Sequence, residues 1–339
     1  MKKAQPGRLS APARLFLLVL PPLTALLALS VGRVQVPLAE VVRSIAAHLG
    51  AGYALNANTE QVLWSMRLPR ILLALLTGAG LAVSGCAFQS LFSNPLATPD
   101  TLGVASGSSF GAALAILLGF HVVGVQALAL ICGIAALTLS WLAGYGRGRG
   151  MNTIILAGIM IGSLFTALVS LVKFVADTES QLPAITYWLM GSLNSASYRT
   201  IAMGAPLIAA GLIVLYLLRW RLNILPLPED EALASGVSLR GLRVTTILCA
   251  TAMTAACVSM CGQVGWVGLL VPHICRMRFG SNHLSLIPAS VSLGASFMVI
   301  VDTLARTLTA ATIPISVLTA IIGAPFFILL LRRSGGWEL

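Results

Sequence analysis

The chain has 339 residues, of which 58% are hydrophobic and 9% are charged, and its mean hydropathy is +0.94. Soluble domains carry roughly 25% charged residues, so this composition excludes a soluble enzyme and a disordered chain. A membrane-spanning helix needs ~20 mostly apolar residues, which leaves room for roughly ten spans and no sizeable soluble domain. The sequence therefore predicts an all-α, polytopic membrane protein with a single transmembrane domain over residues 1–339.

The net charge of +11 comes from 21 Lys and Arg against 10 Asp and Glu. The basic residues lie between apolar segments and not in a stripe with interleaved aromatic residues, so they indicate orientation in a membrane and not nucleic-acid binding. The six cysteines lack CxxC spacing and a companion His cluster. They are interpreted as small buried residues, and neither a disulfide nor a metal site is expected.

Hydropathy predicts ten apolar segments, the eighth of which is too short to span alone. They lie near residues 15–32, 62–92, 99–119, 122–145, 152–176, 199–218, 242–262, 265–276, 286–305 and 314–331. The basic tail 1–14 before the first segment resembles a signal peptide, but its cleavage would leave an odd number of spans, so a retained first helix is expected. With this tail in the cytoplasm, 14 of the 21 Lys and Arg residues fall on the cytoplasmic face. This excess predicts that both termini are cytoplasmic.

A polar segment over residues 222–241 interrupts the apolar pattern. Glu229, Asp230 and Glu231 form an acidic start, and an amphipathic pattern with Gly236 follows. The pattern fits short cytoplasmic helices that lie against a partner, and it fits a solvated connector equally well. Composition alone leaves both interpretations open.

Two stretches of the sequence resemble each other and are expected to run in opposite directions. Residues 70–104 and 243–277 each begin with Arg, continue as a helix rich in Ala, Gly and Ser, and end in a stretch interrupted by Gly and Pro. Similar segments with opposite directions are typical of the inverted repeats of transporters that alternate access. The sequence therefore predicts an inverted repeat.

Small residues and prolines mark close packing and helix breaks. GxxxG spacing occurs at Gly103, Gly107 and Gly111 and again at Gly158 and Gly162, which predicts close helix contacts. Backbone that is freed at membrane depth must be satisfied by protein or by a water-filled cavity, so several breaks imply an internal pathway. Breaks are predicted at Asn94–Pro95, Thr98–Pro99, Val271–Pro272 and Ile313–Pro314.

Charged residues at the predicted outer boundary have two interpretations. Arg67 and Arg70 stand three apart at the start of a helix, and Asp302 and Arg306 stand four apart at the end of another. Long basic side chains at a membrane boundary commonly snorkel. The alternative is a basic rim that docks an acidic partner, since Arg pairs with carboxylates in bidentate geometry. The residues by themselves favour snorkelling.

No catalytic site is predicted. None of Lys2, Lys3 and Lys173 directly follows Gly, so the phosphate-binding GxxxxGK[ST] motif is absent from the sequence, and any ATP use must lie in another subunit. Carboxylates suited to a proton relay are scarce, with Asp100 after a break and Asp302 near a boundary. This scarcity speaks against a proton-coupled secondary transporter.

Eight motifs follow one another along nearly the whole chain. They are RLPR (67–70), NPLATPDTLGVASG (94–107), LAG (156–158), YWLMGS (187–192), LPLPEDEALASG (225–236), GQVGWVGLLVPHICR (262–276), DTLAR (302–306) and IGAPFFILLLRR (322–333). With these motifs, the sequence over residues 36–333 resembles the FecCD family, the permease subunits of type II bacterial ABC importers for iron–siderophore, haem and cobalamin.

The resemblance implies an assembly in the bacterial inner membrane. Two copies of a ten-helix subunit would form a homodimer with the translocation path at their interface. Two cytoplasmic ATPase subunits would bind ATP and Mg, and a periplasmic or lipid-anchored substrate-binding protein would deliver the cargo. No cofactor is expected in this chain, and its remaining contacts would be with membrane lipid.

The resemblance also assigns roles to residues. It favours docking of a partner over snorkelling as the role of the boundary arginines. Arg67, Arg70 and Arg306 match arginines that meet glutamates of the binding protein. The residues that match the segment coupling to the ATPase are Leu225, Pro228, Glu229, Asp230, Glu231 and Gly236. Those that match the cytoplasmic gate are Asn94, Leu96, Met151 and Asn152. The chain departs from the family at Pro228, where Gly is usual, and at residues 262–266, where many members read GPIGF.

The sequence is therefore interpreted as an importer permease that carries a metal chelate inward, with a ferric siderophore preferred over haem or cobalamin. An ion-coupled secondary transporter that works without an ATPase is the alternative. A membrane-embedded enzyme or receptor would need convergent polar residues that the sequence does not show.

Overall fold

The computed structural model describes residues 9–51, 53, 56–144 and 151–333, and within them it contains helices and no strand. This confirms the all-α prediction. The α-helices are α1 (Ala11–Ser30), α2 (Leu38–His48), α3 (Ala57–Glu60), α4 (Leu68–Leu91), α5 (Val104–Leu117), α6 (Val122–Gly144), α7 (Met151–Val175), α8 (Gln181–Leu189), α9 (Tyr198–Leu218), α10 (Glu229–Ala234), α11 (Leu239–Cys261), α12 (Val267–Phe279), α13 (His283–Thr307) and α14 (Ile315–Arg333). A π-helix, η1 (Gln61–Arg67), and two 3₁₀ helices, η2 (Pro99–Leu102) and η3 (Arg221–Ile224), complete the set.

Each of the ten predicted apolar segments contains a helix. In the described part of the chain, seven helical stretches are long and apolar enough to cross a membrane, and they contain α1, α4, α6, α7, α9, α11 and α13. α5, with 14 residues, and α12, with 13 residues, are shorter than the ~20 residues that a full crossing needs. The total of about ten spans and the cytoplasmic location of both termini stay predictions.

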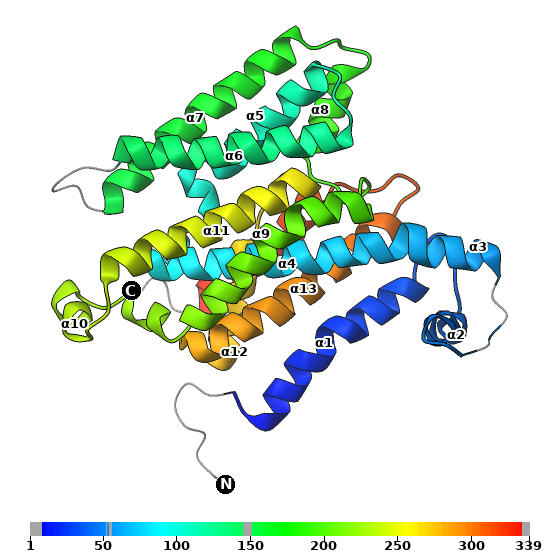
Figure 1. Cartoon of the computed structure of the whole chain (residues 1–339), viewed down its shortest axis with the longest axis horizontal. Helices are drawn as coiled ribbons and strands as arrows, with labels where there is room; N and C mark the ends of the chain where they lie inside the picture. The colour runs from blue at the N-terminus through cyan, green and yellow to red at the C-terminus, as the bar shows by residue number, and fades with distance from the viewer. Residues whose placement is uncertain (1–8, 52, 54–55, 145–150, 334–339) are drawn as a thin grey trace.

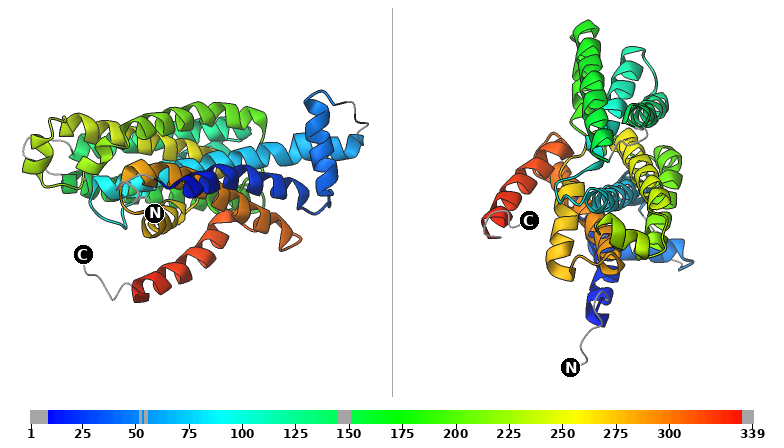
Figure 2. Two further views of the ribbon diagram at one scale, coloured as in Figure 1. Left: turned by 90° about the horizontal axis from the view of Figure 1, so that it is seen from below. Right: turned by 90° about the vertical axis from the view of Figure 1, so that its left-hand side faces the viewer.

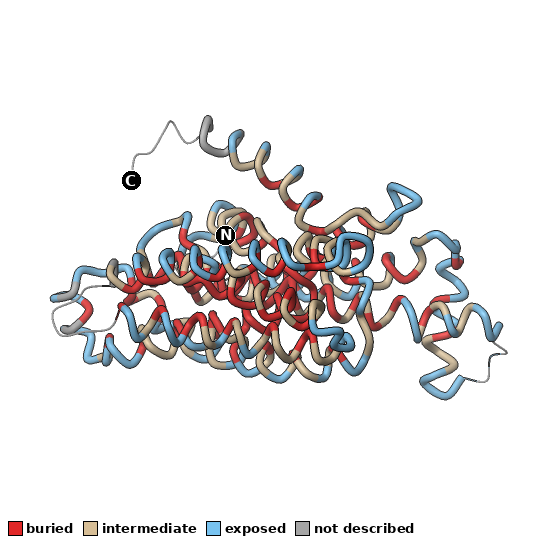
Figure 3. Tube along the Cα trace, turned by 90° about the horizontal axis from the view of Figure 1, so that it is seen from above, coloured by how far each residue is buried: buried red, intermediate tan, exposed pale blue. Residues whose placement is uncertain are grey.

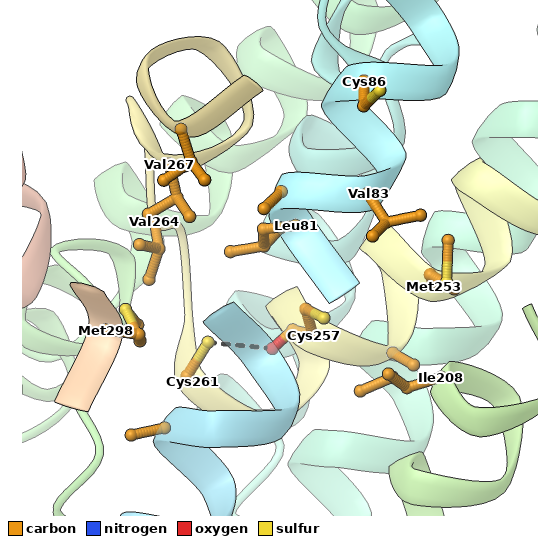
Figure 4. Close-up of a cluster of buried hydrophobic side chains, with 14 of the residues drawn as sticks. Leu81, Val83, Cys86, Ile208, Met253, Cys257, Cys261, Val264, Val267 and Met298 are labelled. Atoms are coloured by element: carbon orange, nitrogen blue, oxygen red, sulfur yellow. Dashed lines mark hydrogen bonds between the residues drawn. The ribbon is translucent and has the colours of Figure 1, made fainter. Parts of the chain in front are cut away.

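α4 is the central helix of the bundle (Figure 1), and buried residues concentrate along the middle of the molecule (Figure 3). It packs against α13, α11, α12 and α9, and nearly all of its side chains from Ile71 to Leu91 are buried. Two glycines of α4 allow this contact: a Cβ on Gly78 would overlap the carbonyl of Gly294, and one on Gly85 would overlap the carbonyl of Gly268. Figure 4 shows the side chains that fill the remaining space, among them Leu81, Ile208 and Met253. Backbone contact through small residues is the way in which helices associate in lipid, where no hydrophobic drive brings them together.

The Gly85 contact leads to a first prediction. Gly85→Ala should lower the free energy of unfolding by about 1–3 kcal/mol, because the added methyl group forces α4 and α12 apart. The thermal unfolding midpoint of the full chain in one detergent measures the effect. Gly265→Ala is the matched control, since a Cβ at Gly265 meets no atom within 4 Å. An equal shift in the two variants would contradict the role of the contact.

α5, α6, α7 and α8 form a second layer beside the central bundle (Figure 1). The predicted GxxxG contacts are confirmed in this layer. Gly107 and Gly111 of α5 face backbone carbonyls of α6, and Gly158 and Gly162 of α7 contact the backbone of η2 and Gly103. Gly103 also has a φ of +75°, which an L-residue adopts only at a cost.

The predicted break at Val271–Pro272 is wrong, because α12 continues through Pro272. Proline removes the N–H that would bond to the carbonyl four residues earlier, here that of Gly268. Gln89 Nε2 of α4 donates to this carbonyl at 3.2 Å, so the helix survives. The chain breaks instead between α11 and α12, where Gly262 and Trp266 have φ values of +73° and +69°. The other predicted breaks are confirmed, since no α-helix crosses them.

The two similar stretches lie side by side. α4 and α11 pack against each other and run in opposite directions, as expected (Figure 1). A break follows each of them, the first before η2 and the second before α12. A symmetry relation between the two stretches stays a prediction.

Two helices at the periphery are only lightly packed. Only 17% of α1 is buried, and its main partner is α13. α14 leaves the bundle at an angle, and its principal contacts are with α13 and α12 (Figure 2). Apolar side chains of α14, such as Ile321 and Ile328, are exposed. The six free cysteines are buried or half-buried, as their interpretation as small packed residues predicts.

Candidate functional site

Functional residues gather at the two ends of the bundle and at the helix breaks between them. The α2 end carries α2, the start of α4 and the end of α13, and the α10 end carries α10, the end of α4 and the start of α13 (Figure 1).

Asp302 is the centre of a buried ion cluster at the α2 end. It is 1% exposed, and its carboxylate accepts two hydrogen bonds from Nε of Arg70, at 2.8 and 3.0 Å. Arg306 Nε lies 3.8 Å from the other side of the same carboxylate. Arg70 NH1 donates to Asn194 Oδ1 at 2.6 Å, which connects α4 to the loop before α9. One carboxylate therefore joins α4 to α13.

Arg67 and Arg306 hold the end of α1. Arg67 is 7% exposed and donates to the backbone carbonyls of Leu29 and Val34. Arg306 NH2 donates to the carbonyl of Ala28 at 2.6 Å. The last carbonyls of a helix have no helical donor, so these guanidinium groups satisfy polar atoms that the fold leaves open. In this conformation the predicted docking arginines share one cluster and donate to groups of the chain itself, while docking stays a prediction.

A cavity of about 400 Å³ opens at the helix breaks. It lies where η2, the start of α5 and the loop between α11 and α12 meet α4, α8 and α14. Polar side chains of Asp100, Ser106, Gln263 and Ser316 converge on it, and Leu81, Val264 and Trp266 supply apolar walls. Backbone breaks around a polar cavity are the arrangement expected for a path through a membrane protein.

Asp100 is the one charged side chain that lines this cavity. It belongs to η2, outside the seven candidate spans, and faces the open space of the cavity. The side chain is exposed to the cavity, and the protein packed around the cavity raises its pKa to about 6 by disfavouring the charged carboxylate.

The raised pKa gives a second prediction, on the pH dependence of stability. Because the pKa of Asp100 is higher in the folded chain than its value of 3.8 in the unfolded chain, the folded state is favoured most below pH 3.8. The free energy of unfolding then falls as the pH rises through about 6. Asp100→Asn should therefore raise the unfolding midpoint relative to the original chain at pH 8 and change it little at pH 4. Asp177→Asn is the control with the opposite sign, because hydrogen bonds from Ser180 lower the pKa of Asp177. If Asp100→Asn raises the unfolding midpoint as much at pH 4 as at pH 8, the charge of Asp100 is not the cause.

A hydrogen-bonded network ties three elements together at the α10 end. Asn223 Oδ1, in η3, accepts from the backbone N–H of His283 at 2.9 Å and lies 2.9 Å from its Nδ1. Nδ1 therefore carries the proton, and Nε2 is left as the acceptor that faces the hydroxyl of Ser90 in α4. Asn223 Nδ2 also reaches Oδ1 of Asn282, the N-cap of α13, at 3.2 Å. His283 is thus a buried link between η3, α4 and α13.

The predicted coupling segment contains short helices, as expected if it lies against a partner. η3 and α10 lie in it, and α10 begins directly after Pro228. Leu225 is buried, whereas Pro228, Asp230 and Glu231 are exposed, and the side chain of Glu229 lies outside the described residues. Gly236 has a φ of +72°, which terminates the helical turn before α11.

The predicted gate residues belong to two places in the fold, the turn after α4 and the start of α7. Asn94 Oδ1 accepts from the backbone N–H of Leu96 at 2.9 Å, which makes a tight turn after α4, and both residues are exposed. Ser93, just before this turn, has a φ of +48°. Met151 and Asn152 begin α7, but their side chains lie outside the described part of the chain. Their role in a gate stays a prediction.

Comparison with known proteins decides the family. The sequence matches the FecCD transport family over residues 17–333. The chain belongs to the FecCD transport family. A molybdate import system permease protein of Haemophilus influenzae, MolB, is 41% identical over 92% of this FecCD chain and 94% of the relative. The hemin transport system permease protein HmuU of Yersinia pestis is 37% identical over 82% of this chain and 86% of the relative.

A solved structure agrees with this FecCD assignment. It is described as a metal-chelate type ABC transporter in an inward-facing conformation, and it superimposes with a TM-score of 0.85 at 40% identity. The superposition covers 95% of this chain and 99% of that chain. Since the relatives are permeases and ABC transporters, the comparisons do not favour the ion-coupled alternative.

Sequence reasoning on this FecCD chain missed Asn194, Asn223 and His283. Asn194 and Asn223 lie close to recognised motifs but carry no spacing signal, and His283 is one of four scattered histidines. A usable signal was the pair Asn282 and His283 at the start of α13, because Asn at an N-cap followed by a buried His indicates a polar helix start.

Proposed function

We propose that this chain is the membrane permease subunit of an ATP-driven importer that moves a metal chelate from the periplasm to the cytoplasm. The match to the FecCD family over residues 17–333 supports the transport class. The cavity at the helix breaks is the observation that carries the mechanism, because it places Asp100 and Gln263 where α4, α5, α11 and α12 are interrupted. The path is proposed to run through this cavity.

The α10 end is proposed to face the cytoplasm and to seat the ATPase subunits, which would bind ATP and Mg. The exposed carboxylates Asp230 and Glu231 of α10 give that end a surface for a partner. η3 lies in the same segment and joins α4 and α13 through Asn223 and His283. A displacement of the coupling segment by the ATPase would therefore move α4. This helix ends just before Asn94 and Leu96, the proposed gate.

The α2 end is proposed to dock the substrate-binding protein. Arg67, Arg70 and Arg306 give this end a surplus of positive charge over Asp302, which suits an acidic partner. In the described conformation each of the three donates at least one hydrogen bond within the chain, so we propose that they act through the local field and not as free side chains.

Two copies of the chain are proposed to enclose the path. α14 makes few contacts within one copy and exposes Ile321 and Ile328, and α7 exposes Met160 and Phe174. An apolar helix that leaves its own bundle gains packing contacts against a second copy.

The cargo is proposed to be a ferric siderophore. The residues that line the cavity include the carboxylate of Asp100 and no basic side chain. A carboxylate in the path repels an oxyanion such as molybdate and is compatible with a bulky chelate whose metal charge is shielded by organic ligands. Haem and cobalamin are compatible with the same lining.

Native mass spectrometry of the tagged chain, purified gently from its own membranes, tests the proposal together with an ATPase assay on the same sample. Two copies bound to two ATPase subunits are expected. A chain that carries no ATPase in several mild detergents would overturn the importer assignment. Uptake of a ferric siderophore, haem, cobalamin and molybdate by the same cells, with and without the gene, then tests the cargo.

The two ends of α9 give a third prediction, on orientation. A photo-crosslinking amino acid at Tyr198, which is exposed at the α2 end, should capture the substrate-binding protein. The same amino acid at Trp220, exposed just after α9 at the α10 end, should capture the ATPase. The two positions are each other's control, and the reverse pattern would invert the proposed orientation.

A further inference from the structure

A groove of about 760 Å³ lies on the side of the bundle at the α10 end, between α1, α9 and α13. None of the roles described above uses it. Its lining includes the basic residues Arg14 and Arg219 and the apolar residues Leu18, Pro22 and Val291. α1 is a candidate span that is 17% buried, so this side of the bundle faces the bilayer.

Among the described residues that line the groove, two are positively charged and none is negatively charged. Arg14 comes from α1, and its Nε donates to the carbonyl of Leu9 at 3.0 Å. Arg219 follows α9, with its guanidinium carbon 3.9 Å from the ring centre of Tyr216 and its NH1 bonded to the Tyr216 carbonyl at 2.6 Å. These contacts hold each guanidinium group in place and use only part of its five donors.

The rest of the groove is apolar and has a fixed shape. Pro21 of α1 removes the N–H that would bond to the Leu17 carbonyl, and Ser292 Oγ of α13 donates to that carbonyl at 2.6 Å. This hydrogen bond ties α1 to α13 through two residues that line the groove. Pro22 and Pro288 contribute rigid rings to its walls.

We propose that this groove binds an anionic phospholipid, with its phosphate between Arg14 and Arg219 and an acyl chain along Leu18, Pro22 and Val291. The two charges and the apolar wall match an amphipathic anion, and a side that faces the bilayer is in contact with such molecules at all times. Basic pockets between helices on the cytoplasmic side recognise anionic headgroups in this way. The bound lipid would fasten α1, which has few protein contacts, to the bundle.

Native mass spectrometry of the full chain, purified in delipidating detergent and titrated with phosphatidylglycerol or phosphatidylcholine of the same acyl chains, tests the site. The original chain should retain phosphatidylglycerol preferentially. The double variant Arg14→Gln/Arg219→Gln should bind it about 30-fold more weakly, since each basic residue contributes about 1 kcal/mol toward an anionic lipid. Binding of phosphatidylcholine should change little.

Two further variants separate the groove from general surface charge. Arg221→Gln removes an exposed arginine that lies near the groove but does not line it, so it should leave lipid binding unchanged. Leu18→Trp fills the apolar wall while both arginines remain, so it should weaken phosphatidylglycerol binding. The proposal is overturned if Arg221→Gln acts as strongly as the double variant, if the two lipids bind equally, or if Leu18→Trp alters the number of copies of the chain and not the bound lipid.

Discussion

Replacing Asp302 by Ala should lower the free energy of unfolding by about 3–5 kcal/mol, the cost of removing one partner from a buried charge pair. Arg70 and Arg306 would then lie in the bundle without a counter-charge, at 15% and 11% side-chain exposure. Arg70 Nε, which now donates to both oxygens of the carboxylate, would also lose its acceptors. The thermal unfolding midpoint of the full chain in one detergent, compared with the original chain, measures the loss.

Two variants test whether the uncompensated charge causes this loss. Asp302→Asn keeps a carbonyl acceptor for Arg70 and should be less destabilising than Asp302→Ala. Adding Arg70→Met to Asp302→Ala removes a stranded charge and should recover part of the stability. If the loss of unfolding free energy in the double variant equals the sum of the losses in the two single variants, Asp302 and Arg70 act independently.

Replacing Asn223 by Ala should uncouple ATP hydrolysis from transport in the proposed assembly. The variant loses the acceptor for His283 and the donor to Asn282, so η3 is no longer joined to α13 and, through His283, to Ser90 of α4. The ratio of cargo transported to ATP hydrolysed in proteoliposomes should fall about tenfold, a coupling energy near 1.4 kcal/mol. Assembly with the ATPase should persist, because the Asn223 side chain bonds to elements of its own subunit.

The conservative variant Asn223→Asp provides the control. It keeps the Oδ1 acceptor for His283 and loses the Nδ2 donor, so it should restore most of the ratio. A normal ratio in Asn223→Ala would exclude the network from coupling. A loss of ATPase from the purified complex would instead assign Asn223 to assembly.

Helix positions and small-residue contacts could be predicted from the sequence because both depend on local patterns. A run of apolar residues defines a helix in lipid regardless of its neighbours. The spacing of Gly103, Gly107 and Gly111 likewise marks a face that admits another backbone. The prediction at Pro272 is wrong because it also depends on the local pattern alone. That pattern predicts a break, but the helix continues because Gln89, on another helix, donates to the freed carbonyl of Gly268.

The boundary arginines show the limit of sequence reasoning at the site. Their spacing places Arg67 and Arg70 at a helix start, but it carries no information on the carbonyls of α1 that Arg67 and Arg306 satisfy. Asp100 was recognised only as a residue after a break. The cavity that it shares with Gln263 exists because two breaks far apart in the chain meet in space.

The sequence by itself determined the membrane class, the helical segments, the absence of a nucleotide-binding motif and the ordered motifs that lead to the FecCD family. The tertiary structure alone decided the pairings of polar groups. Arg70 and Asp302 are 232 residues apart and Ser90 and His283 are 193 apart. Both pairs join α4 to α13, whose backbones meet at Gly78 and Gly294, and they satisfy polar atoms that lipid cannot.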